Sequence, residues 1–248
     1  MSLRYRSAAR THVGLVRKVN EDSMLARDDA ALWIVADGMG GHDNGQWASQ
    51  TLVAQLAALD LAVNRNARGA AILHALKDGN DAIHDAATAA GKQMGTTAVV
   101  VHCDAEDVLL IWVGDSRIYR LRGPQFVQMT RDHTMVQDLV DRGTLHPSEA
   151  ETHPMSHVLS RAVGTEAVLR YDSLVDRAVA GDRYLLCSDG LSKVVSDDQV
   201  AAILSTGTID SAAERLIAET LERGAPDNTT VIVLSAEEAT ALGLRPRA

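Results

Sequence analysis

Short apolar runs and long amphipathic stretches alternate along this chain of 248 residues. The apolar run that starts at Trp33 is typical of a buried strand, and the pair Asp37-Gly38 predicts that this strand ends there. Residues 47–63 and 70–90 carry apolar side chains at the spacing of one helical face. We therefore expect a strand followed by two long amphipathic helices.

The second half of the chain has a different texture. Residues 96–129 form short β-rich runs separated by polar turns, which predicts an antiparallel meander. A polar, histidine-rich stretch at 131–164 precedes two more strand-like runs. Near the end, Ser211 and Glu214 predict a capping box that begins a helix, and a last strand follows it.

Nothing in this pattern marks a domain boundary, because the chain has no internal repeat, low-complexity segment or linker. We therefore expect a single domain over residues 1–248. Antiparallel strands with helices grouped in pairs, without β-α-β alternation, favour an α+β layered architecture.

Composition narrows the class of protein. The 33 acidic and 24 basic residues give a formal charge of −9, which disfavours binding to nucleic acid or to an anionic membrane. No apolar run is long enough for a membrane helix, and the basic N-terminal segment lacks the apolar stretch of a signal peptide. We expect a soluble, cytoplasmic monomer in which Cys103 and Cys187 are buried thiols.

An aspartate recurs at the ends of the apolar strands. Asp37, Asp115 and Asp189 each follow such a run, and Asp227 precedes the last one. If these ends share one rim of the sheets, their charges would repel one another unless a cation lay among them. All-oxygen ligands favour Mg²⁺ or Mn²⁺, and glycine at position 38 would let a backbone carbonyl approach the metal. The alternative is four unrelated turn aspartates.

A second group of charged residues lies upstream. Arg17 stands five residues before Asp22, with Glu21 beside it, in a segment where Val13 and Leu15 suggest strand alternation. A guanidinium suits bidentate contact with a phosphate, and neighbouring acids suit water-mediated contact with a metal. The alternative is a surface arginine in a solvated run of charges.

Eight short motifs occur in order along the chain: RKVNED, ADGMGGH, GTTAVV, VGDSRIYR, TRDHT, LSRAVG, LLCSDGL and APDNTTVIV. Their order and spacing resemble the metal-dependent protein phosphatase 2C family in its compact bacterial form. The resemblance extends from about Thr11 to Leu234. It implies a four-layer α/β-β/α sandwich, with two central antiparallel sheets flanked by helix pairs, a core at about 11–236 and a short tail at 237–248.

The resemblance also implies a binuclear Mn²⁺ or Mg²⁺ site at one end of the sandwich. Asp37 corresponds to the carboxylate that bridges the two ions, and Gly38 corresponds to a backbone carbonyl ligand. Asp189 and Asp227 correspond to the remaining carboxylates. Asp115 together with Asp189 matches a third metal position found in bacterial members.

Other residues match the surroundings of the metals. Glu21 and Asp22 correspond to acids that contact metal mainly through water, and Arg17 corresponds to the phosphate-binding arginine. Residues 132–159 fall where the family has a mobile flap near the substrate entrance.

The implied reaction is attack of a metal-bridging hydroxide on phosphoserine or phosphothreonine, with Arg17 and the metals neutralising the phosphoryl oxygens. It needs no phosphoenzyme, so neither cysteine has a catalytic task. Eukaryotic members commonly carry a histidine, proposed as the general acid, where this chain has Met39. His42 is a candidate for that role; a metal-bound water, or a loop histidine without a catalytic role, is the alternative.

The leading hypothesis is a protein serine/threonine phosphatase that acts on phosphorylated proteins and counteracts a bacterial kinase. Alternatives are a phosphatase of narrow specificity and a silent pseudophosphatase that only binds phosphoproteins. The presence of Arg17, Asp37, Asp189 and Asp227 favours an enzyme. A metal-dependent nuclease is disfavoured by the net acidity. Four further histidines do not have the spacing of a compact metal motif: His133, His146, His153 and His157.

Overall fold

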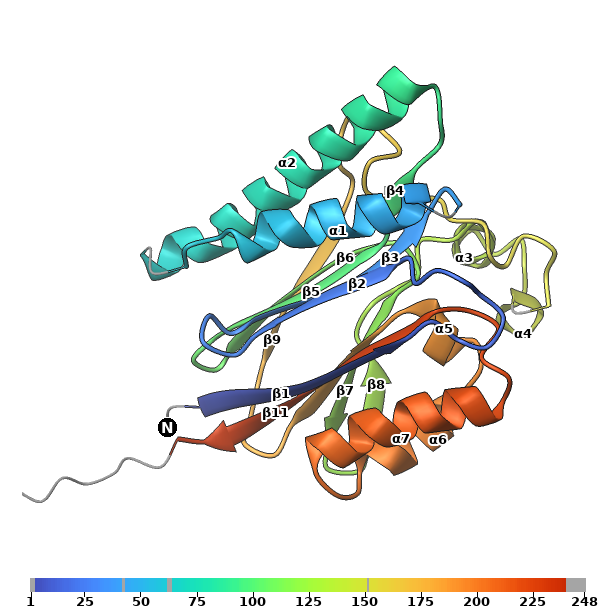
Figure 1. Ribbon diagram of the computed structural model, residues 1–248. Helices are drawn as coiled ribbons and strands as arrows, with labels where there is room; N and C mark the ends of the chain where they lie inside the picture. Colours follow the sequence, from blue (N-terminus) through green and yellow to red (C-terminus); the bar gives the residue numbers. More distant parts are fainter. Residues whose placement is uncertain (1–2, 42, 62–63, 151, 240–248) are drawn as a thin grey trace, which may run out of the picture.

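The computed structural model describes residues 3–41, 43–61, 64–150 and 152–239. Two antiparallel sheets stack face to face, and helices cover the outer face of each sheet (Figure 1). The predicted α+β four-layer sandwich is therefore confirmed. Among the described helices, none combines the length and the apolar character that crossing a bilayer requires.

The elements follow in this order: β1 (Leu3–His12), β2 (Asp22–Arg27), β3 (Leu32–Met39), α1 (Asp43–Ala57), α2 (Arg65–Ala90), β4 (Gly95–Thr96), β5 (Ala98–Asp104), β6 (Asp107–Val113), β7 (Arg117–Arg122), β8 (Gln125–Gln128), α3 (Met135–Asp141), α4 (Pro147–Ala150), β9 (Asp172–Arg177), β10 (Arg183–Cys187), α5 (Asp189–Ser192), α6 (Asp197–Leu204), α7 (Ile209–Glu222) and β11 (Thr229–Glu238).

One sheet has the order β1-β11-β10-β7-β8, and the other has β2-β3-β5-β6-β9 with β4 paired to β3. The first and last strands lie side by side in the first sheet, where β1 and β11 pair along their whole length from Leu3↔Glu238 to His12↔Thr229. This pairing extends beyond residues 11 and 236, between which we placed the core.

Three apolar layers hold the sandwich together. Helices α1 and α2 pack on the sheet that contains β3 through residues such as Leu52 and Ile72, and α6 and α7 pack on the other sheet through residues such as Leu216. Strand β3 alternates between two of these layers: Ile34 faces the helices, whereas Trp33 lies between the sheets. Both faces of β3 are therefore buried, which explains why its sequence is a continuous apolar run.

The predicted meander over residues 96–129 is wrong in one respect, because its strands belong to different sheets. β5 and β6 form a hairpin in one sheet, and β7 and β8 form a hairpin in the other. The chain changes sheets between β6 and β7, at Gly114, Asp115 and Ser116. Gly114 has a φ of 100°, a left-handed conformation that redirects the strand and that residues other than glycine rarely adopt. Asp115 consequently lies where the two sheets meet.

The strand expected around Val13 and Leu15 is also wrong. Residues 13–21 form a loop, Leu15 is 63% exposed, and β2 begins only at Asp22. Gly14, at a φ of 83°, interrupts the extended conformation at that point. Strand β3, in contrast, is longer than predicted. It does not stop at Asp37 but continues to Met39, because Gly38 and Met39 pair with the short strand β4.

The helix boundaries differ from the predicted ones. α1 and α2 begin at Asp43 and Arg65, earlier than the apolar periodicity indicated, and α1 ends at Ala57, before the predicted end at residue 63. The N-cap of α7 is Thr208, whose side chain accepts a hydrogen bond from the N–H of Ser211, and these two residues form the capping box. Glu214 was the wrong partner for Ser211: its carboxylate binds Arg10 of β1 at 2.8 Å.

Candidate functional site

Four strand ends bring their aspartates to one rim of the sandwich. Asp37 lies near the end of β3, Asp115 follows β6, Asp189 follows β10, and Asp227 precedes β11. All four line one cavity of about 630 Å³. Three further residues with predicted roles line the same cavity: Arg17, Glu21 and Gly38.

Threonines on the neighbouring segment hold the backbone of Asp37 in place. The N–H of Asp37 donates to Thr97 Oγ1 at 2.9 Å, and its carbonyl accepts from Thr96 Oγ1 at 3.0 Å. The Thr97 hydroxyl also lies 2.7 Å from Ser116 Oγ, which follows Asp115 in the turn between the sheets. These contacts tie two of the aspartates to one buried framework.

Gly38 lies against the first turn of α1. A Cβ on Gly38 would meet the carbonyl oxygen of Gly45 at 2.1 Å, so no larger residue fits without moving the backbone. Ser49 of α1 donates to the carbonyl of Glu21 at 2.6 Å. The N-terminal part of α1 therefore rests directly on the backbone around the acidic residues.

Asp22 does not line the cavity but is buried behind it. Its Oδ2 accepts hydrogen bonds from Ser188 Oγ at 2.8 Å and from Thr230 Oγ1 at 2.7 Å. Its Oδ1 is buried and has no hydrogen-bond partner in the described part of the chain. A buried carboxylate oxygen without a donor is unfavourable unless a positive charge lies near it.

The carboxylates perturb one another. Burial, followed by the charges of Asp22, Asp189 and Asp115, holds the pKa of Asp37 well above its ordinary value. Burial raises the pKa of Asp22 to about 7, although its hydrogen bonds oppose the shift, and raises that of Asp115 to about 6, reinforced by Asp189. A positive charge placed among these carboxylates would therefore be stabilising.

Two basic side chains contact these acids. Arg17 binds Asp227, with Nη2 2.7 Å from Oδ2. Lys193, at the end of α5, binds Asp189 and lies 3.2 Å from Asp115 Oδ2. Sequence reasoning missed Lys193, although its spacing of four residues from Asp189 is that of an ion pair on one helical face.

The donor set fits a hard divalent cation, because the charged ligands at the rim are carboxylates and one buried oxygen of Asp22 lacks a donor. Within the described ranges, no three acidic, histidine or cysteine side chains are already arranged as a coordination set. The ammonium of Lys193 and the guanidinium of Arg17 hold three of the carboxylates instead. A bound cation would therefore share these carboxylates with their basic partners.

The remaining predicted residues are placed as follows. Met39 lines the cavity, and so do His157, Val158 and Leu159 from the segment 132–159. His42 lies outside the described residues. His133 is buried away from the cavity: its Nδ1 accepts from the N–H of Gly114 at 3.1 Å, and its Nε2 lies 3.0 Å from Asp172.

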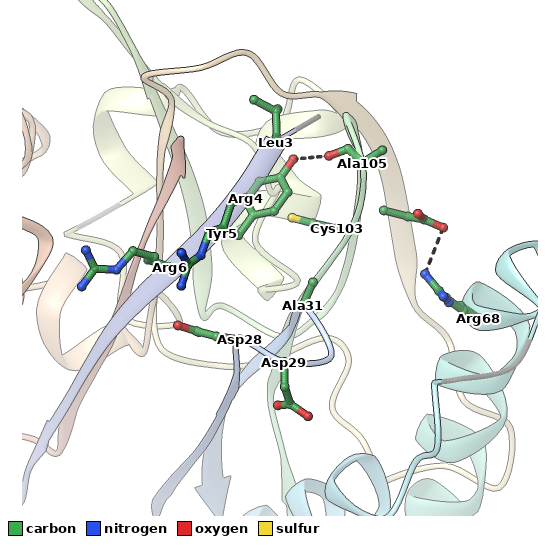
Figure 2. A pocket seen from close by; sticks show the side chains of 11 residues that line it. Leu3, Arg4, Tyr5, Arg6, Asp28, Asp29, Ala31, Arg68, Cys103 and Ala105 are labelled. Atoms are coloured by element: carbon green, nitrogen blue, oxygen red, sulfur yellow. Dashed lines mark hydrogen bonds and ion pairs between the residues drawn. The ribbon is translucent and has the colours of Figure 1, made fainter. Parts of the chain in front are cut away.

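A second cavity of about 490 Å³ lies at the opposite rim and contains none of the predicted site residues (Figure 2). Tyr5, Asp28, Arg68 and Cys103 are among the side chains that line it. Burial raises the pKa of the Cys103 thiol, so this cysteine is not an activated nucleophile. The three aspartates of this cavity share the lining with three arginines: Asp28, Asp29 and Asp104 with Arg4, Arg6 and Arg68.

The arrangement of the rim agrees with comparisons to known proteins. The family model described as protein phosphatase 2C matches residues 6–139, more than half of the chain. The chain belongs to the protein phosphatase 2C family. The resemblance inferred from the eight motifs is thereby confirmed.

Relatives within the protein phosphatase 2C family include the serine/threonine protein phosphatase PstP of Mycobacterium tuberculosis, 42% identical over 235 residues that are 94% of this chain but 45% of PstP. The chain thus spans about half the length of that relative. Protein phosphatase PhpP of Streptococcus pneumoniae is 32% identical over 92% of this chain and 96% of its own length. A crystal structure of the PstP catalytic domain in complex with two manganese ions superposes with a TM-score of 0.87 at 40% identity, covering 96% of this chain and all of that one.

Proposed function

We propose that this chain is a metal-dependent protein serine/threonine phosphatase that hydrolyses phosphoserine and phosphothreonine. The observation that carries the proposal is the convergence of Asp37, Asp115, Asp189 and Asp227 on one cavity that also contains Arg17. Membership of the protein phosphatase 2C family and the names of the bacterial relatives support it.

In this proposal Asp37, the Gly38 carbonyl, Asp189 and Asp227 would hold two Mn²⁺ or Mg²⁺ ions. Asp115, with Asp189, is the candidate for a third position. When bound, the ions would neutralise phosphoryl oxygens and lower the pKa of a coordinated water. The two manganese ions in the PstP catalytic domain support this assignment.

Glu21 and Asp22, at the start of β2, would lie near the ions. Their carboxylates would orient water around the cations. The buried Oδ1 of Asp22, which has no hydrogen-bond donor among the described residues, supports a nearby positive charge.

Arg17 would bind the phosphate of the substrate. Its side chain is 53% exposed at the cavity and already pairs with an oxyanion, the Asp227 carboxylate. A guanidinium can exchange one oxyanion for another without changing its own charge, and its planar donors suit two phosphoryl oxygens.

The leaving alkoxide needs a proton, and Met39 cannot donate one. His42 and a water at the rim are the two candidates, and His42→Ala distinguishes them. A general acid loses its proton at high pH, so kcat declines on the alkaline side of the pH profile. Loss of that decline in His42→Ala would assign the proton to His42. An unchanged profile would assign it to water.

The segment 132–159 would act as a mobile flap that contacts the substrate. Its contribution of His157, Val158 and Leu159 to the wall of the cavity supports this role. The beginning and the end of the segment are hydrogen-bonded to each other: Met135 N–H donates to the carbonyl of Val158 at 2.8 Å, and Thr134 pairs with Leu159. Motion would therefore be greatest around α4.

The wider setting follows from this activity. We infer a single catalytic domain that acts as a monomer in the cytoplasm and reverses the action of a bacterial serine/threonine kinase. The three continuous apolar layers support a single domain. Two free, buried cysteines fit a reducing compartment.

The test is turnover of a phosphothreonine peptide with Mn²⁺, with a chelator, and with Asp37→Asn. We expect metal-dependent release of phosphate that falls by about 10³-fold in the variant, because a central charge of the site is lost. A wild type that binds Mn²⁺ but turns over neither this peptide nor a panel of phosphoproteins would support a binding module instead.

A further inference from the structure

Lys193 is a basic side chain placed among the acidic residues of the rim. Its ammonium binds the carboxylates of both Asp189 and Asp115. The Asp115 side chain is 6% exposed and the Lys193 side chain 46%, so the carboxylate of this ion pair is shielded from solvent while the lysine is partly exposed. Lys193 also lines two cavities, which share Asp115 and Val194.

The fold fixes Lys193 in this position. Lys193 is the C-cap of the short helix α5, and its N–H donates to the carbonyl of Asp189 at 2.9 Å. Leu191 and Val195, on either side of it, are buried in the apolar layer under α6 and α7. Because the backbone is held on both sides, the Cα of Lys193 stays at a position from which its side chain can contact Asp189.

The formal charge at the rim balances with two divalent cations. Six carboxylates gather there: Glu21, Asp22, Asp37, Asp115, Asp189 and Asp227. Among the described residues that line the cavity, one is an arginine, Arg17, and one is a lysine, Lys193. Their two positive charges reduce the formal charge from −6 to −4. Two divalent ions bring it to zero, whereas a third would leave an excess of positive charge beside the ammonium.

We propose that the ammonium of Lys193 takes the place of a third divalent cation between Asp115 and Asp189. The proposal rests on the proposed metal centre and goes beyond it. A third ion binds at this position only when Lys193 leaves it. Lys193 is therefore a positioning residue, which holds Asp115 and orients Asp189 toward the other two ions.

Metal stoichiometry tests the proposal directly. Chelator-stripped wild type, Lys193→Gln and Lys193→Arg are dialysed against a series of Mn²⁺ concentrations, and the bound manganese is counted by mass spectrometry. We expect two ions per chain in the wild type and in Lys193→Arg over a range where Lys193→Gln takes up a third. The apparent dissociation constant of that third ion should be lower by about tenfold or more in Lys193→Gln.

A second readout does not require metal binding. Without metal, Lys193→Gln should melt below the wild type, because Asp115 and Asp189 lose their counter-charge, whereas Lys193→Arg should not. Saturating Mn²⁺ should raise the melting temperature of Lys193→Gln more than that of the wild type. Lys77→Gln, on the exposed face of α2, controls for the loss of one positive charge.

The outcomes separate this proposal from the proposed metal centre. Equal numbers of ions bound with equal affinity by the wild type and Lys193→Gln would overturn the role of Lys193 and leave the metal centre intact. Absence of Mn²⁺ binding to either protein would overturn both. Circular dichroism of each variant establishes that it is folded before the ions are counted.

Discussion

The side chain of Asn228 holds the loop that carries Arg17 and Glu21. Its Oδ1 accepts from the N–H of Glu21 at 2.8 Å, and its Nδ2 donates to the carbonyls of Val13 and Val19 at 2.8 and 3.0 Å. Asn228 is 5% exposed and adjoins Asp227, so one residue connects the C-terminal strand to the N-terminal loop of the site.

Asn228→Ala should therefore destabilise the protein by about 2–3 kcal/mol, since three hydrogen bonds to buried or half-buried groups are lost. Urea unfolding measures this difference in the free energy of unfolding. Gln50→Ala, on the exposed face of α1, is the control and should change it by less than about 0.5 kcal/mol. An equally small change for Asn228→Ala would contradict its structural role.

Gly38→Ala should destabilise the protein and weaken metal binding. The added Cβ would lie 2.1 Å from the Gly45 carbonyl oxygen, which forces α1 away from the acidic rim at a cost of about 1–3 kcal/mol.

Gly69→Ala in α2 is the matched control, and we expect it to raise the stability of the protein. Its Cβ would meet only Leu109 Cδ2, at 3.4 Å, and alanine favours the helix by up to about 1 kcal/mol. Thermal melts with and without Mn²⁺ measure both variants. A Gly38→Ala protein as stable as the wild type would show that the backbone of Gly38 does not lie tightly against the Gly45 carbonyl.

Parts of this architecture could be predicted from local sequence. The aspartates at strand ends and the amphipathic helices follow from short patterns, because burial and turn formation depend on neighbouring residues. The change of sheet at Asp115 could not be predicted in this way, since it depends on which distant strands pair. β7 lies beside β10, which is more than 60 residues further along the chain.

The residues that support the rim could not be predicted from local sequence either. Asn228, Thr97 and Ser188 act through contacts with residues far away in sequence, and nothing in their immediate neighbourhood indicates those partners. The capping box at Thr208 was missed for a local reason: Ser211 suits both the N-cap and the N3 position, and only the backbone conformation of Thr208 decides between them.

The metal-free protein should lose stability as the pH rises from about 4 to about 7. Folding raises the pKa of Asp115 from 3.8 to about 6 and that of Asp22 to about 7, mainly through burial. Between these values the folded state binds more protons than the unfolded state, so each increase in pH favours unfolding. Because one pKa unit corresponds to about 1.4 kcal/mol, the rises from 3.8 to about 6 and to about 7 together give a loss of up to about 7 kcal/mol.

Urea titrations of chelator-treated protein at several pH values test this dependence. Asp37→Asn should be more stable than the wild type at pH 7 without metal, because one repelling carboxylate is removed. A metal-free wild type whose stability is flat or rises over this range would contradict the burial of ionisable carboxylates at the rim.

Neither cysteine should be needed for turnover. Cys103 and Cys187 are both buried, and burial raises the pKa of each thiol, to about 12 for Cys187. The double variant Cys103→Ala, Cys187→Ala should retain kcat within about threefold even if its melting temperature falls. Loss of phosphatase activity in a folded double variant would point to a covalent thiol intermediate instead.

The rim aspartates should hold divalent cations, and anomalous diffraction from crystals grown with Mn²⁺ locates such ions. We expect two peaks at coordination distance, about 2.0–2.4 Å, from the carboxylates of Asp37, Asp189 and Asp227. Peaks elsewhere on the protein, or none at this rim in a Mn²⁺-saturated crystal, would contradict this expectation.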